Sequence, residues 1–147
     1  MASNFQKPSI KEVADFLAAQ GPFDLAVTVN LKKRHHIYQV NNSFEQAEKS
    51  AYWLLSRLNE SVLKRRYRYK NEQLKSICSV EKGVEKRLHL HLAIGIPSGI
   101  NQYQFISKLN KIHRKMDWAY GEIHIAPSLN DGWLNYISKE GFDSVLL

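Results

Sequence analysis

The sequence predicts an α+β fold: an antiparallel sheet of four to five strands with helices packed on one face and a short helix near the C-terminus. Three observations predict it. Segments with apolar residues at every second position alternate with segments whose apolar residues follow a helical period. Glycine and proline separate these segments. The 147 residues, 44% of them hydrophobic, suffice for one domain over 1–147 with a sizeable core.

The first two predicted elements are a helix and a strand. Ser9 followed by Glu12 forms a capping-box pattern, which predicts a helix over 10–20 that ends before Gly21. The segment 23–32, FDLAVTVNLK, alternates apolar and polar residues and predicts a half-buried strand. Its apolar face consists of Phe23, Leu25, Val27, Val29 and Leu31.

A long helix and a hairpin follow. A second capping pattern, Ser43 to Gln46, begins a predicted helix over 44–66. Residues 73–81 predict a strand, and RLHLHLAIG, residues 87–95, is its expected hairpin partner. Because the two segments are so close in the chain, we expect them to pair as antiparallel strands.

The remaining elements complete a known order. A helix is predicted from about 100 to 115, a strand over 118–126 and a short helix over 131–140. The core order is therefore strand–helix–strand–strand–helix–strand, as in ferredoxin-like and RRM-like domains. In that topology the first and third strands are central. The third predicted strand, RLHLHLAIG, therefore lies inside the sheet.

The charge of the chain indicates a polyanionic partner. The formal net charge is +7 and the pI is about 9.5. These values favour nucleic acid or an anionic membrane surface as the binding partner. No apolar run approaches the roughly 20 residues of a membrane span, and the start, MASNFQKPS, predicts no secretion signal. A single cysteine, Cys78, predicts a reducing, intracellular compartment without an internal disulfide.

Two histidines stand one residue apart in the strand RLHLHLAIG. Side chains two apart on a strand share a face and lie roughly 6.7 Å apart along it. His89 and His91 therefore point to the open face of the sheet. The opposite face carries Leu88, Leu90, Leu92 and Ile94, and the leucines would pack under the helices. Two imidazoles at that spacing can converge on one metal ion.

A carboxylate is expected beside this pair. If the hairpin turn centres on Glu85, residues whose numbers sum to 170 face each other, which places Glu81 opposite His89. Glu81 would then complete a site of two histidines and one carboxylate. Glu85 is the alternative third ligand, ranked second because it lies in the turn itself. His35, His36 and His113 are given no role.

The predicted C-terminal helix carries a second pair of chemical groups. Tyr136 and Lys139 are three residues apart and therefore neighbours on one helix surface. A nearby ammonium favours phenolate over phenol, which makes the tyrosine a candidate nucleophile. The alternative is a half-buried tyrosine that closes the core beside a solvated lysine.

Together these features resemble the HUH endonucleases, named for histidine–hydrophobic–histidine. That motif reads His89-Leu90-His91, the family's Tyr-x-x-Lys motif reads Tyr136-Ile137-Ser138-Lys139, and a first-strand motif is present loosely as LAVTVN, 25–30. The resemblance covers roughly 23–140, and the best match is the single-tyrosine replication initiators (Rep proteins) of rolling-circle plasmids, phages and small circular DNA viruses.

The resemblance implies a function and its partners. His89, His91 and Glu81 would hold Mg²⁺ or Mn²⁺, and Tyr136 would attack single-stranded DNA at a replication origin, possibly in a hairpin, leaving a 5′-phosphotyrosine. Lys139 would assist. The domain would be monomeric and would rely on a host helicase and polymerase. It would act in the bacterial cytoplasm, or in the host nucleus for a eukaryotic virus.

Further residues are expected to contact DNA. The run KRRYRYK, 64–70, interleaves cations with aromatic rings, a combination suited to single strands, although the solvated end of a helix explains it equally well. Other basic residues leave the end of the first strand, and several polar side chains should share the histidine face. The predicted contacts are Thr28, Asn30, Lys32, Arg34, Arg65, Arg66, Tyr67, Arg68, Arg87 and His124.

Two other functions compete with this one. A single-tyrosine transposase of an insertion sequence would share the fold and the histidine pair, but such enzymes usually carry glutamine four residues after the tyrosine, where Glu140 stands. A non-catalytic ferredoxin-like module that binds nucleic acid would need no tyrosine. Histidine-triad hydrolases and two-histidine phosphoesterases fit worse, because their further motif residues are missing.

Overall fold

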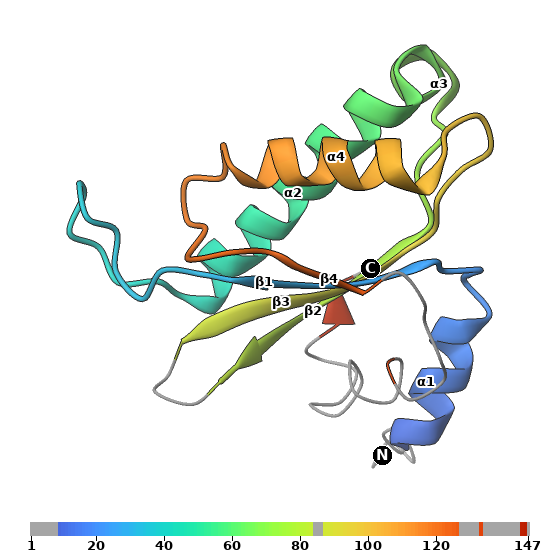
Figure 1. The fold of residues 1–147 in the computed structure, drawn as a ribbon. Coiled ribbons are helices and arrows are strands. Elements are labelled where there is room, and N and C mark those ends of the chain that lie inside the picture. Colours follow the sequence, from blue (N-terminus) through green and yellow to red (C-terminus); the bar gives the residue numbers. More distant parts are fainter. Residues whose placement is uncertain (1–8, 84–86, 127–132, 134–144, 147) are drawn as a thin grey trace.

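The computed structural model describes residues 9–83, 87–126, 133 and 145–146. It has an α+β fold, as predicted (Figure 1). The helices are α1 (Ile10–Ala18), α2 (Phe44–Leu63), α3 (Arg65–Lys70) and α4 (Gln102–His113). The strands are β1 (Leu25–Asn30), β2 (Ser76–Lys82), β3 (Leu88–Ile94), β4 (His124–Ala126) and β5 (Val145–Leu146).

The strands form one antiparallel sheet in the order β4-β1-β3-β2-β5. The first four strands are arranged as in a ferredoxin-like domain, and β1 and β3 lie inside the sheet as predicted. The pairing of β5 with β2 lies beyond the predicted elements. A strand of two residues is too short to show any alternation in the sequence.

The core lies between the sheet and the helices α2 and α4, which cover one of its faces in Figure 1. The alternating apolar residues of β1 and β3 pack there against apolar residues of both helices. Helix α1 lies on the other side of the sheet in Figure 1, so the prediction that the helices share one face is wrong for α1. Among the fully buried side chains are Leu25, Val27, Leu54, Leu58, Leu90, Leu92, Phe105 and Leu109.

Two predicted elements are shortened in the structure by an unusual backbone conformation. The helix predicted over 44–66 stops at Leu63, because Lys64 has φ 52 and ψ −118 and the chain begins α3 at the next residue. The strand predicted over 118–126 is a strand only from His124, because Gly121 adopts φ 67 and leaves the extended region.

The loop between β1 and α2 is held by His35, to which the sequence assigned no role. Its imidazole is fully buried. Its Nδ1 accepts hydrogen bonds from the backbone N–H groups of Ile37 and Tyr38, both 3.2 Å away. The proton is therefore on Nε2, which donates to Asp117 Oδ1 at 2.9 Å. His35 thus joins this loop to the segment after α4.

Candidate metal centre

The β2–β3 hairpin positions the candidate metal ligands. Glu81 pairs with His89, and Ser79 pairs with His91, so the predicted register is confirmed. The N–H of Gly83 donates to the carbonyl of Arg87 at 2.8 Å and continues the same register towards the turn. Side chains of directly opposed residues project to one face, which brings the carboxylate to the imidazoles.

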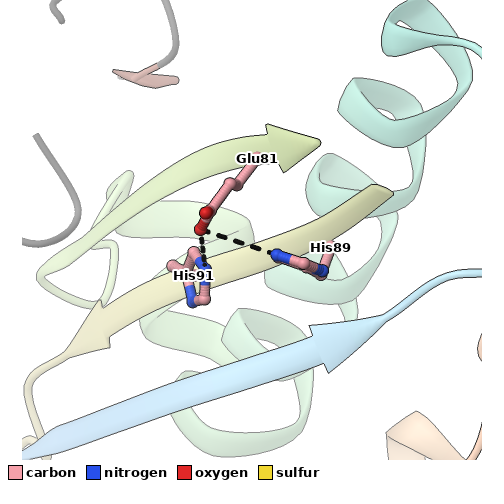
Figure 2. Close-up of side chains that lie close together, drawn as sticks. All are labelled: Glu81, His89 and His91. Carbon is pink, nitrogen blue, oxygen red and sulfur yellow. Dashed lines mark hydrogen bonds and ion pairs between the residues drawn. The ribbon is translucent and has the colours of Figure 1, made fainter. Parts of the chain in front are cut away.

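The three side chains converge on one another (Figure 2). Glu81 Oε2 is in direct contact with His91 Nε2 and lies 3.5 Å from His89 Nε2. One ligand atom from each of the three residues lies within 4.8 Å of the other two. Ligand atoms about 2.1 Å from a shared ion stand at most roughly 4.2 Å apart, so small side-chain rotations would close the set on one metal.

The site is more buried than the sequence indicated. His91 is 5% exposed and Glu81 is 8% exposed, whereas the side chain of His89 remains 18% exposed. The prediction that both imidazoles line an open face is therefore wrong for His91. The partly exposed His89 marks the side from which a water molecule or a phosphate oxygen can approach an ion bound here.

Thr28, which was predicted to contact DNA, lies beside the metal ligands. It pairs with His91 across β1 and β3, and its Oγ1 is 3.2 Å from His91 Nδ1. When His91 Nε2 binds a metal, Nδ1 carries the proton and donates it to a hydrogen-bond acceptor. The Thr28 hydroxyl is positioned to be that acceptor and so to orient the ring.

Gly83 gives His89 the space that it occupies. A Cβ atom built on Gly83 would stand 2.3 Å from Cε1 of His89, far inside any normal contact. The position therefore requires glycine for as long as the imidazole keeps this orientation. A glycine two residues beyond a predicted ligand is a signal of close approach that the sequence offers at Gly83.

Trp133 lies beside the candidate metal site. Its Nε1 donates to the carbonyl of Leu92 at 3.1 Å, and its ring meets that of His91 edge-on, with centroids 5.4 Å apart. Trp133 was not among the residues predicted for the site. Tyr136, Lys139 and Glu85, for which roles were predicted, lie outside the described residues.

Several predicted DNA contacts share the face of the metal site. Asn30 is paired with His89, and His124 is paired with Thr28, so both project to that face. Arg87 lies on it too, where its Nη1 donates to the carbonyl of Leu31 at 3.1 Å. The guanidinium of Arg87 also lies 3.6 Å from the ring centroid of Tyr120.

Two other predicted contacts, Lys32 and Arg34, are held by hydrogen bonds near the end of β1. Lys32 Nζ donates to the carbonyl of Asp117, in the segment after α4, at 2.6 Å. Arg34 donates to the side chains of Gln39 and Asn41 across the loop between β1 and α2. These bonds hold both basic side chains at the end of β1.

The basic residues of α3 are not brought to the metal site. Helix α3 lies far from the end of β2 and the start of β3 in Figure 1. Arg66 forms two hydrogen bonds to the carboxylate of Glu72, which lower the pKa of that carboxyl, and Arg68 is 3.0 Å from Glu60. Arg65 lies beside the ring of Tyr69. Tyr67 lies 3.4 Å from Ser56 through its hydroxyl.

The single cysteine of the chain, Cys78, has a buried thiol. Cys78 is 1% exposed in the core, and this burial raises the pKa of its thiol well above the ordinary value. It therefore stays protonated and unreactive at neutral pH.

The comparisons with known proteins identify no relative. Neither a protein-family model, nor a curated protein, nor a solved structure matches this chain. Within the described part of the chain, no helix has both the length and the apolar character needed to cross a membrane.

Proposed function

We propose that this protein nicks and rejoins single-stranded DNA through a tyrosine, as its resemblance to HUH endonucleases implies. The observation that carries the proposal is the convergence of Glu81, His89 and His91 within 4.8 Å on one side of the sheet. A carboxylate and two imidazoles on one hairpin form a ligand set for a divalent metal, with one side left for substrate.

The position of Trp133 supports a nucleophile from the C-terminal segment. Trp133 is in contact with His91, and Tyr136 follows it by three residues. Three residues of chain span at most roughly 11 Å. This closeness of Tyr136 to Trp133 in the sequence supports the choice of Tyr136 as the nucleophile.

The proposed reaction exchanges one phosphoester bond for another. The metal would polarise the scissile phosphate and stabilise charge on its oxygens. The phenolate of Tyr136 attacks phosphorus, and the bond from phosphorus to the 3′ oxygen breaks as the new bond forms. The 3′ oxygen leaves and takes up a proton, while the 5′ phosphate stays on the tyrosine. The reverse step rejoins the strand, and the Lys139 ammonium favours the phenolate.

The metal and the biological setting follow from the resemblance. Imidazole and carboxylate together accept several divalent ions, and we propose Mg²⁺ or Mn²⁺ because phosphoryl oxygens are hard ligands. The substrate would be single-stranded DNA at a replication origin, where nicking begins rolling-circle replication by a host helicase and polymerase. The net charge of +7 agrees with a polyanionic substrate.

A covalent-adduct assay tests this proposal. The protein is incubated with single-stranded oligonucleotides from its own replicon, with Mn²⁺ or with a chelator, and run on a denaturing gel. We expect a metal-dependent protein–DNA band that is absent in Tyr136→Phe and reduced by at least about a hundredfold in His91→Ala.

Tyr120→Phe is the matched control, because it also removes one phenolic hydroxyl and should leave the band at the wild-type level. A band that survives Tyr136→Phe would assign the nucleophile elsewhere. The absence of a band on every replicon segment, despite DNA binding, would favour the non-catalytic module.

A further inference from the structure

Two adjoining hollows lie along α4. The larger, about 870 Å³, lies between α4 and the segment 116–123. The smaller, about 490 Å³, lies between α4 and the end of α2 at Ser61. Tyr103 and Ser107 line both hollows, so the two form one continuous groove, which we call the α4 groove.

The α4 groove is strongly basic. Lys32 and Arg114 line the larger hollow, and Lys108, Lys111 and Lys115 line the smaller one. Among the lining residues the only carboxylate is Glu122. This balance of five cations to one anion gives the groove a positive potential that favours a polyanion.

An exposed aromatic ring stands where the two hollows meet. Tyr103 is 83% exposed, although a ring of that size usually buries part of its surface. A solvated aromatic face among cations is the arrangement that holds single-stranded nucleic acid, because bases stack on the ring while phosphates contact the charges.

His113 supplies a buried polar group with no partner. Its residue is 6% exposed, it lines the larger hollow, and its Nε2 has no hydrogen-bond partner among the described residues. Burial lowers the pKa of the imidazole, which is therefore neutral at neutral pH. A neutral ring nitrogen can bond to a heteroaromatic base, whereas an unsatisfied buried nitrogen costs stability.

We propose that the α4 groove is a second binding site for single-stranded DNA, with one base stacked on Tyr103 and a neighbouring base inserted into the hollow lined by His113. The lysines and Arg114 contact the phosphates. The inference deepens the proposed function and rests on it for the choice of DNA. Helix α4 lies on the sheet face opposite the histidines, so the groove holds a stretch of strand away from the cleaved bond (Figure 1).

Fluorescence anisotropy tests the stacking step. The full chain is titrated into a fluorescein-labelled oligothymidylate of about twelve nucleotides, in chelator, so that no cleavage occurs. Tyr103→Ala should weaken binding about tenfold, the effect of losing one stacked base. Tyr52→Ala, which removes an exposed tyrosine of α2, should leave the affinity unchanged. Equal affinities for both variants would overturn the proposal.

The salt dependence of binding tests the phosphate contacts. The double variant Lys108→Gln/Lys111→Gln should reduce the slope of log affinity against log salt by about 1.4, or roughly 0.7 for each lost contact. Lys49→Gln/Arg57→Gln makes the same change of charge on α2 and should preserve the slope. A duplex of the same length should bind more weakly. Tighter binding of oligouridylate would assign the groove to RNA and overturn the DNA assignment.

The His113→Phe variant tests the base pocket. Phenylalanine fills similar space without a polar atom, so the variant should melt at a higher temperature and yet bind the oligothymidylate about tenfold more weakly. Unchanged affinity of His113→Phe for the oligothymidylate would show that no base binds at His113.

Failure of the two proposals can be told apart. If groove variants weaken binding but no adduct forms, the nuclease proposal fails alone. If the adduct forms and no groove variant alters binding, the groove proposal fails alone.

Discussion

At the scale of single residues, the candidate metal site depends on groups that are not ligands. Thr28 lies 3.2 Å from the Nδ1 of His91, and Gly83 leaves room for the ring of His89. Groups that hold a ligand in one orientation contribute to metal affinity almost as the ligands do, because a free ring must be ordered when the ion binds.

Removing the Thr28 hydroxyl should therefore weaken metal binding. Thr28→Val keeps the shape of the side chain but removes the hydroxyl that lies 3.2 Å from His91 Nδ1. We expect the affinity for Mn²⁺ to fall about 10- to 100-fold. The loss of the electron paramagnetic resonance signal of free Mn²⁺ on titration measures this directly.

Thr28→Ser is the matched control, since it restores the hydroxyl and should bind Mn²⁺ within a few-fold of the wild type. If Thr28→Val and Thr28→Ser bound the ion equally well, the hydroxyl would have no part in the site.

At the scale of elements, the junction of α2 and α3 is a strained point. Lys64 has φ 52 and ψ −118, a combination that residues with a Cβ atom rarely adopt. Such conformations cost on the order of 1–3 kcal/mol and persist only where surrounding structure enforces them. Here the helices on either side enforce it, because α2 packs on the sheet and α3 packs on α2.

Glycine at this junction should stabilise the protein. Lys64→Gly relieves the strain, but glycine also gives the unfolded chain more conformational freedom, which offsets part of the gain. We expect the free energy of unfolding to rise by about 1 kcal/mol in total. Urea unfolding measures the change. Lys70→Gly, in the last turn of α3, is the control and should lower the same quantity by about 0.5–1 kcal/mol. A loss of stability in Lys64→Gly would refute strain at the junction.

At the scale of the whole molecule, the basic α4 groove and the candidate metal site lie on different faces of the sheet. The candidate metal ligands are on the sheet face opposite α2 and α4, and the basic groove follows α4. A polyanion that contacts both must pass around the edge of the sheet. Five basic residues of the described chain line this groove, where a strand could be held.

The stability of the whole molecule should fall in mild acid. Burial lowers the pKa of His113 below its ordinary 6.5. In mild acid the unfolded chain therefore binds a proton at His113 more readily than the folded chain does. The free energy of unfolding should therefore be greatest above pH 6.5 and decrease as the pH falls towards the folded pKa, by less than about 1.4 kcal/mol per pH unit from this group.

Urea unfolding at several pH values between neutrality and mild acid measures this effect. His113→Phe lacks the group and should lose less stability over the same range. An identical pH dependence in both proteins would mean that other groups account for it.

The sequence by itself determined the features that arise between near neighbours in the chain. Alternation placed Leu90 and Leu92 in the core, and the short hairpin set the pairing of Glu81 with His89. These follow from local geometry, because side chains alternate along a strand and a tight turn leaves little choice of register. Most element positions and the three candidate ligands were therefore predictable.

Only the tertiary structure decided which distant segments meet. No periodicity indicates that Trp133 contacts His91 or that Tyr103 stands between two basic hollows. Nor does it indicate that His113 Nε2 is buried without a hydrogen-bond partner in the described part of the chain. Such contacts depend on how whole helices pack on the sheet, and packing is set by the summed shape of many side chains rather than by spacing along the chain. The break at Lys64 has the same origin, since the packing around it outweighs the local preference for helix.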